Sequence, residues 1–258
     1  MKICYIVAMR AEAQPFIEQF GVQEVPCFFA PLPCQLYHTT LPPSQTPLDP
    51  PSISLPSSPR GEGQGGGGHE LYVVLNGEQH GSDLVGCEAA SVATLAAIQK
   101  LSPDLIINSG TCGAFKANGA GIGDVFLGNA VMFHDRRVPG DDAWGTQALG
   151  NYPVWEGAPA LAEKLGFKMG KVTTGSSLDM QPCDLQIIQE NHGELKDMEG
   201  AAVAFVCSLF HTPILFVKSV TDLCDSGAET YEEFSKNLAL ACQNLKEANA
   251  KIIQELCK

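Results

Sequence analysis

The sequence predicts a layered α/β protein, in which helices pack against a β-sheet. Short apolar runs of strand length alternate along the chain with longer segments whose apolar residues recur at helical spacing. The run ILFVKSV at 214–220 is mostly apolar and lacks the polar alternation of a half-exposed strand. We therefore expect the 214–220 strand to lie in the centre of the sheet.

The first part of the chain predicts a strand, a helix and a hairpin. A buried strand is expected at 3–9, and the segment AEAQPFIEQF after it has the pattern of a helix. LYHTTL (36–41) and ELYVVLNG (70–77) are expected to be the two strands of the hairpin. Residues 42–68 between them hold seven prolines and end in a glycine tract. Because such a segment buries too little apolar surface to offset the entropy of ordering, we predict a disordered insertion at the hairpin tip.

The rest of the chain continues the alternation of helices and strands. The expected elements are a small-residue helix at 89–101, one or two strands at 123–135, strands at 104–110 and 171–178, and a buried helix at 200–210. From Thr230 onward, apolar residues at helical spacing predict a helix that covers the sheet with one face. Thr230 and Glu233 match the capping-box pattern at its start.

Composition narrows the classes of partner and compartment. Asp and Glu number 29 against 16 Lys and Arg, so the formal charge of −13 argues against nucleic acid and anionic membrane surfaces as partners. No apolar run approaches the length of a membrane span, and the short N-terminal run is interpreted as a first strand rather than a signal peptide. The ten cysteines include no CxxC pair and no Cys/His metal spacing. We expect reduced thiols in the cytoplasm and no metal site.

Three acidic residues stand where apolar segments stop. Glu12 comes shortly after the first strand, Glu199 precedes the 200–210 helix, and Asp222 follows the 214–220 strand. In an open α/β sheet, ligands bind in the crevice outside the carboxyl ends of the strands. Three carboxylates converging there predict acid/base chemistry on a small neutral molecule.

Each carboxylate has a chemical interpretation and a plainer one. Burial disfavours the charge of Asp222 and raises its pKa, which suits a general acid oriented by the Thr221 hydroxyl; the alternative is a simple loop cap. The helix start favours the ionised form of Glu199, which then accepts hydrogen bonds from two donors such as a ribose diol; the alternative is an ordinary helix charge. Glu12 is placed to deprotonate a water, although glutamates are common in first helical turns.

The sequence lacks the motifs of a phosphate-binding loop, a dinucleotide-binding site and a GxSxG hydrolase. NSGTCGAF follows a strand and offers backbone N–H groups with the Thr111 hydroxyl, but it lacks the GK[ST] ending of a phosphate-binding loop. NGAGIGD is followed by a strand-like segment, whereas a dinucleotide fingerprint opens a helix. No GxSxG is present, so a hydrolase triad of that type is not supported.

Six segments occur in the order found in one family: AMRAE, NSGTCGAF, GIGDVFL with FHDRR, TTGSSLDM, KDMEGAAVA and KSVTDLCD. The chain resembles the 5′-methylthioadenosine/S-adenosylhomocysteine nucleosidases of the nucleoside phosphorylase superfamily, in their plant-type branch, over nearly its whole length except 42–68. The resemblance implies a single domain over 1–258 with a three-layer α/β/α fold around a central twisted mixed sheet, similar to the phosphorylases and hydrolases of this superfamily.

The resemblance also implies roles for individual residues. Glu12 matches the proton acceptor that activates the attacking water, and Asp222 matches the proton donor to the adenine leaving group. Glu199 matches the residue that holds the ribose hydroxyls, with Met198 beside it. The other positions expected to bind substrate or shape its site are Thr111, Leu178, Asp179, Lys196, Asp197, Lys218, Thr221 and Phe234.

Several of these positions have a more specific expectation. Leu178 and Asp179 fall where the family holds the purine, the first by packing and the second through its backbone. Phe234 matches an aromatic near the alkylthio pocket. Lys218 stands where an arginine is usual near the water and the ribose, and Leu178 replaces the usual aromatic, as in the plant-type branch.

The function implied by the resemblance is hydrolysis of the N-glycosidic bond of 5′-methylthioadenosine, which releases adenine and 5-methylthioribose in methionine salvage. A homodimer that needs no cofactor is implied as well, and S-adenosylhomocysteine stays open as a second substrate. A purine nucleoside phosphorylase, in which phosphate replaces water, is the alternative enzyme. A storage protein that has lost catalytic residues is the non-enzymatic alternative, which the presence of all three carboxylates argues against.

Overall fold

The computed structural model describes residues 1–42, 68–138 and 142–258. The predicted disordered insertion at 42–68 lies outside these residues except for its first and last positions. The strands of the main sheet are β1 Lys2–Val7, β2 Gln23–Val25, β3 Gln35–Leu41, β4 His69–Leu75, β7 Leu105–Ala114, β8 Val125–Phe133, β9 Lys168–Thr174, β10 Leu195–Asp197 and β11 Ile214–Leu223. The helices are α1 Arg10–Phe20, α2 Cys87–Leu101, α3 Asp142–Leu149, α4 Ala158–Leu165, α5 Pro182–Glu190, α6 Gly200–Leu209 and α7 Thr230–Leu256, with a 3-10 turn η1 at Lys116–Asn118. A small separate hairpin consists of β5 Glu78–Gln79 and β6 Ser82–Asp83.

The main sheet is mixed and has the strand order β10-β9-β8-β11-β7-β1-β4-β3-β2. The strands β4, β1, β7 and β11 run parallel to one another, while β3 and β8 run antiparallel to their neighbours β4 and β11. The 214–220 segment lies within β11, between β7 and β8, so its predicted central position is confirmed. The predicted hairpin is also confirmed, because β3 pairs antiparallel with β4.

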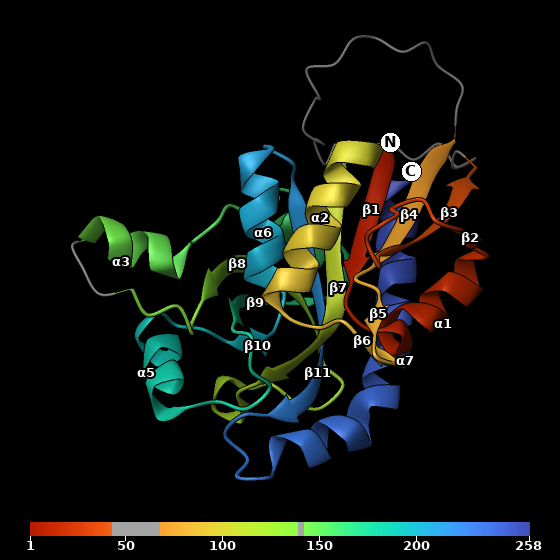
Figure 1. The fold of residues 1–258 in the computed structure, drawn as a ribbon. Helices are drawn as coiled ribbons and strands as arrows, with labels where there is room; N and C mark the ends of the chain where they lie inside the picture. The colour runs from red at the N-terminus through yellow and green to blue at the C-terminus, as the bar shows by residue number, and fades with distance from the viewer. Residues whose placement is uncertain (43–67, 139–141) are drawn as a thin grey trace.

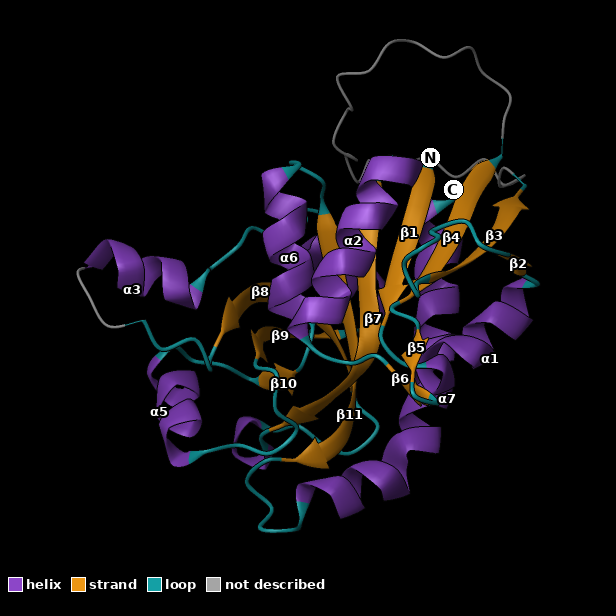
Figure 2. Cartoon of the chain, viewed as in Figure 1, coloured by secondary structure: helices purple, strands orange, loops and turns teal. Residues whose placement is uncertain are grey.

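Helices cover both faces of the sheet and complete three layers (Figures 1 and 2). The helices α2 and α6 lie together on one face, and α1 and α7 lie on the other. The alternation of side chains along a strand explains how one sheet supports two cores: Ile6 and Ile106 face α2 and α6, while Tyr5 and Ile107 face α1 and α7. The expected three-layer α/β/α architecture with a central mixed sheet is therefore confirmed.

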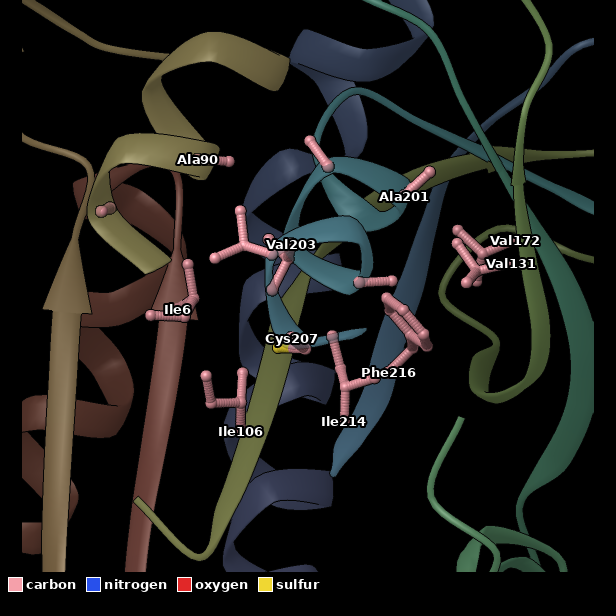
Figure 3. Packing of buried hydrophobic residues seen from close by; sticks show 14 of the residues in the cluster. Ile6, Ala90, Ile106, Val131, Val172, Ala201, Val203, Cys207, Ile214 and Phe216 are labelled. Atoms are coloured by element: carbon pink, nitrogen blue, oxygen red, sulfur yellow. The ribbon is translucent and has the colours of Figure 1, made fainter. Parts of the chain in front are cut away.

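Small side chains allow α6 to lie close against the sheet. Ala201, Val203 and Cys207 are at most 1% exposed and pack over Ile106 and Phe216 of β7 and β11 (Figure 3). Because these side chains are short, the helix approaches the strands closely and its N-terminus is fixed next to the carboxyl ends of β7 and β11. Glu199, the residue before α6, is thereby fixed as well.

Two irregularities of the sheet shape its carboxyl edge. The short strand β10 pairs parallel with β9 and antiparallel with β7, which closes five strands into a ring. In β11 the register shifts between Val220, which faces Cys112, and Asp222, which faces Gly113. Thr221 is therefore the extra residue of a β-bulge, a device that re-aims the following side chain.

The start of α7 differs from its prediction. The N-cap is Glu229, whose carboxylate accepts the backbone N–H of Glu232. Glu233 accepts the N–H of Leu223 at 2.7 Å instead of closing a capping box with Thr230, so that prediction was wrong. The reason is tertiary: the end of β11 offers a backbone donor that local sequence does not reveal. Within the described part of the chain, no helix combines the length and apolar character needed to cross a membrane.

Candidate active site

A cavity of about 220 Å³ opens at the carboxyl ends of β1, β7 and β11. The predicted site residues that line it are Glu12, Thr111, Leu178, Lys196, Asp197, Met198, Glu199, Thr221, Asp222 and Phe234. These residues come from six separate parts of the chain, and the sheet brings them together. The three carboxylates thus border one shared space, as expected from their positions at the ends of apolar segments.

Glu12 is held by donors on two sides. Its Oε1 accepts the backbone N–H of Thr111 at 2.7 Å and the Thr111 hydroxyl at 2.8 Å, and its Oε2 accepts the N–H of Met9 at 3.1 Å. The side chain belongs to the first turn of α1 and is 7% exposed. Burial raises the pKa of Glu12 above its usual value, although these hydrogen bonds and the charge of Lys218 oppose the rise. The result is a fixed carboxylate of increased basicity.

Asp222 contacts the same strand, β7, at a different residue. The β-bulge places it on the face of Gly113, where an added Cβ would lie only 2.7 Å from Asp222 Oδ2. The Thr221 hydroxyl donates to Asp222 Oδ1 at 2.8 Å, as the sequence predicted. Burial raises the pKa of Asp222, while this hydrogen bond and the positive charge of Lys196 limit the increase.

The two carboxylates are separated along β7. Glu12 contacts the strand at Thr111 and at Gly110, where an added Cβ would lie 3.2 Å from Glu12 Oε1. Asp222 contacts the strand at Gly113, three residues from Gly110. At about 3.3 Å per residue of an extended strand, the contact points of Glu12 lie roughly 7–10 Å from that of Asp222. A separation of this order leaves room for a sugar ring and a water between an acid and a base.

Glu199 is oriented by a residue that sequence reasoning missed. Its Oε1 accepts the backbone N–H of Gly86 at 2.7 Å, and the side chain makes no cap on α6 itself. Gly86 has φ 94° and ψ 174°, a conformation available essentially only to glycine. Burial, reinforced by the neighbouring carboxylate of Asp197, raises the pKa of Glu199 to about 7. The expectation that the helix start would favour ionisation was wrong, because burial and Asp197 outweigh the charge of Lys218 and the hydrogen bond from Gly86.

Asp197 of the cavity wall forms a buried ion pair with Lys218 behind it. The Lys218 ammonium lies 2.7 Å from Asp197 Oδ2, which also accepts the N–H of Gly200 at 3.0 Å. The other oxygen, Oδ1, accepts the Thr174 hydroxyl. Burial alone would lower the pKa of Lys218, but Asp197 and Glu199 raise it. Asp197 lines the cavity with both its oxygens engaged within the protein, and Lys218 lies outside the lining, so the pair supports the site rather than binding a ligand directly.

The remaining predicted residues divide between the cavity wall and its surroundings. Met198 and Thr111 form part of the wall, and Leu178 and Phe234 lie at exposed or half-exposed parts of it. Asp179 does not line the cavity; its exposed carboxylate accepts a hydrogen bond from the Gln181 side chain. Its predicted contact with a purine through the backbone stays a prediction.

The structure adds wall residues that were not predicted. They are Ala8, Met9, Val85, Cys112, Gly113 and Tyr231. A sequence signal existed for Tyr231, because it precedes Phe234 by three residues and so shares one face of α7. A glycine directly before α2 was a similar signal for the turn that carries Val85 and Gly86.

Comparison with known proteins places this geometry in a family. Residues 2–254 match the family model of the phosphorylase superfamily. The chain is 39% identical to 5′-methylthioadenosine nucleosidase of Arabidopsis thaliana, with 97% of this chain and 85% of the relative covered. It is 37% identical to 5′-methylthioadenosine/S-adenosylhomocysteine nucleosidase of the same plant, with 97% and 90% covered.

Solved structures agree with the sequence comparison. The apo structure of Arabidopsis thaliana 5′-methylthioadenosine nucleosidase matches with a TM-score of 0.84 at 38% identity, covering 98% of this chain and 94% of the other. Futalosine hydrolase of Helicobacter pylori matches with a TM-score of 0.74 at 20% identity over 99% and 98%, a likeness that concerns the fold alone. The chain belongs to the phosphorylase superfamily and, within it, to the 5′-methylthioadenosine/S-adenosylhomocysteine nucleosidases.

Proposed function

We propose that the protein hydrolyses the N-glycosidic bond of 5′-methylthioadenosine to give adenine and 5-methylthioribose, a step of methionine salvage. The observation that carries this proposal is that Glu12 and Asp222 line one cavity, where they contact β7 at different residues. The names of the Arabidopsis relatives support the choice of nucleoside. The chemistry follows from the state of each carboxyl group.

Asp222 acts as the general acid. Adenine leaves poorly as an anion, so a proton delivered to the imidazole ring of the purine lowers the barrier. The raised pKa of Asp222 increases the fraction of the carboxyl that holds this proton near neutral pH. The Thr221 hydroxyl fixes Oδ1, so the carboxyl keeps one orientation toward the cavity.

Glu12 acts as the general base toward water. Three hydrogen bonds from Thr111 and Met9 hold its carboxylate in place before substrate arrives. Such preorganisation avoids the cost of reorienting the group during the reaction. A water bound between Glu12 and the sugar attacks the anomeric carbon from the face opposite the leaving adenine.

Glu199 holds the ribose and stabilises the charge that develops on it. Because Gly86 occupies only Oε1, Oε2 stays available to accept the ribose hydroxyls. As the bond to adenine breaks, positive charge builds on the sugar, and a nearby carboxylate lowers the energy of that state. Met198 packs beside the ribose, Leu178 packs against the purine, and Phe234 borders the alkylthio group.

The test is the variant Asp222→Asn. It keeps the shape of the side chain but removes the proton, so we expect turnover to fall by about 10²–10⁴-fold with nucleoside binding retained. Adenine release measured by absorbance gives the rate, and calorimetry gives the affinity. Near-native turnover in this variant would refute the assignment of Asp222 as the acid.

Two alternatives are separated by simple assays. In a purine nucleoside phosphorylase, adenine release would depend strictly on phosphate; we expect release in its absence. A storage protein would release no adenine in either condition. Turnover of S-adenosylhomocysteine, measured beside that of 5′-methylthioadenosine, decides whether it is a second substrate.

We also propose a single domain over 1–258 that forms a homodimer in the cytoplasm and needs no cofactor. One sheet joins strands from β1 to β11, which supports the single domain.

The dimer is supported by an exposed apolar surface on α2 and α6, two helices that pack together. Its residues, each at least 39% exposed, are Val92, Leu95, Phe205 and Leu209. Such a surface is typical of a protein interface. All ten cysteines are free, in keeping with a reducing compartment. Sedimentation of Leu209→Glu against the unaltered protein tests the dimer: a monomeric variant supports it.

A further inference from the structure

Lys196 is a buried lysine that binds backbone rather than a carboxylate. Its side chain lines the cavity, yet the residue is only 6% exposed. The ammonium donates to the carbonyl oxygens of Ser177 at 2.8 Å and Leu178 at 2.9 Å. Hydrogen bonds from a charged donor are about twice as strong as those between neutral groups. A single side chain thus holds two successive peptide units.

The loop that receives these hydrogen bonds has no apolar anchor of its own. Residues 176–179 between β9 and α5 are all exposed. The start of the loop is attached by three further contacts. Gly175 N–H donates to the carbonyl of Asp197 at 3.2 Å, Ser176 N–H donates to Asp135 Oδ2 at 2.8 Å, and the Ser176 side chain is hydrogen-bonded to Cys87. Beyond Ser176, the Lys196 ammonium supplies the contacts that hold the backbone at Ser177 and Leu178.

The strand register places Lys196 on the same row as Asp222. Lys196 of β10 faces Gly113 of β7, and Gly113 faces Asp222 of β11. Residues that face one another across a sheet point to the same side, and neighbouring strands lie about 4.8 Å apart. Because Gly113 has no side chain, nothing of the middle strand separates the two outer side chains on this row. Lys196 is also paired with Thr173 of β9, so its backbone is fixed on both sides.

We propose that Lys196 is a positioning residue that fixes the 176–179 loop at a set place opposite Asp222. This inference rests on the proposed function, in which the loop packs against the purine and Asp222 protonates it. The lysine acts through the loop and needs no contact with the reacting atoms. Without its ammonium, the loop has to be ordered when the substrate binds, and that cost weakens the bound state and the transition state equally.

The consequence is a split between the two kinetic parameters. A cost shared by the bound state and the transition state raises KM and leaves kcat nearly unchanged. The charge of Lys196 also lowers the pKa of Asp222, so kcat is compared on the plateau of its pH profile. There, in Lys196→Met, we expect KM for 5′-methylthioadenosine to rise about tenfold, with kcat within about twofold of the unaltered protein. Methionine matches lysine in length, and the two freed carbonyls belong to exposed residues that water reaches, so the variant should fold. If it does not, Lys196→Gln, which is too short to reach both carbonyls, takes its place.

Hydrogen exchange of the loop amides in the absence of substrate is the decisive measurement. The amide to follow is that of Ser176, which donates to Asp135 Oδ2. We expect it to exchange faster in Lys196→Met and to stay unchanged in Lys171→Met, a matched control on β9 whose lysine does not line the cavity. Lys196→Arg keeps charged donors for both carbonyls and should restore slow exchange and most of the affinity.

Two results would overturn the positioning role. One is loop exchange in Lys196→Met that equals that of the unaltered protein. The other is a loss of kcat at unchanged KM, which would mean that the lysine acts on the chemical step instead. The exchange measurement needs no turnover, so it tests the hold on the loop even if the chain fails to release adenine, and that failure would count against the proposed function alone.

Discussion

The ammonium of Lys218 lies 2.7 Å from Asp197 Oδ2, with 1% of the lysine side chain and none of the aspartate side chain exposed. This pair joins the central strand β11 to the short strand β10, and Lys218 acts electrostatically on Glu199 and Glu12. Its positive charge pairs with Asp197 and opposes the rise in pKa of Glu12 and Glu199. The pair therefore has an electrostatic role as well as a structural one.

Loss of this ammonium should destabilise the fold strongly. In Lys218→Met, Asp197 keeps a buried charge without a partner, and breaking a buried pair in this way costs about 3–5 kcal/mol of unfolding free energy. Urea denaturation followed by circular dichroism measures it. The double variant Lys218→Met with Asp197→Asn removes the unpaired charge and should be more stable than Lys218→Met alone. A single variant within about 1 kcal/mol of the unaltered protein would contradict this assignment.

The pH dependence of activity should report Glu199. Its pKa of about 7 means that the free enzyme holds Glu199 partly protonated at neutral pH, whereas the ribose hydroxyls need an acceptor. We expect kcat/KM to rise with pH through a midpoint near 7, since this ratio reports groups of the free enzyme. Glu199→Gln should lose about 10²–10³-fold in rate, and its residual activity should lack the step. A profile that is flat across neutral pH would reject this role.

The raised pKa of Glu199 should also make the free energy of unfolding depend on pH. Activity should rise with pH, whereas this free energy should fall. The pKa of Glu199 rises from 4.5 in the unfolded chain to about 7 in the folded one, so between these values the folded state binds more protons. The free energy of unfolding should therefore fall as pH rises through this window, by on the order of 1–3 kcal/mol from this group. Denaturation series at several pH values check the slope. Glu199→Gln should flatten it, and an equally steep slope in that variant would assign the effect to other groups.

A methyl group at Gly113 should damage catalysis without unfolding the protein. An added Cβ would lie 2.7 Å from Asp222 Oδ2 and 2.8 Å from Cys224 Sγ, so the carboxyl must move. Because misplacing a catalytic group by about 1 Å costs roughly 10²-fold in rate, we expect a loss of that size in Gly113→Ala. Gly121→Ala is the control, since its added Cβ would meet nothing closer than 3.6 Å. Equal activity of the two variants would show that Asp222 tolerates displacement.

Local sequence was sufficient for the framework of this fold. The apolar character of 214–220 predicted a central strand, the two strand-like runs around the proline-rich insertion predicted a hairpin, and both are present. Most of the cavity wall was also predicted, because six motifs in order identified the family and residues at the ends of strands collect at one edge of a sheet. Periodicity depends on neighbouring residues and motif order depends on position along the chain. Both can therefore be recognised from the sequence without knowledge of the fold.

Only the tertiary structure decided how the charged groups of the site are held. The bulge at Thr221 turns Asp222 to the face of Gly113, and the pairing of β10 with β7 brings Lys196 to the same row. Gly86 reaches Glu199 across more than a hundred residues of sequence, and burial there reverses the expected effect of the helix start. Such contacts depend on register and packing between distant segments. The sequence by itself determined which residues meet at the sheet edge, and the folded structure determined their orientation and protonation, because both depend on non-local pairing and exclusion of water.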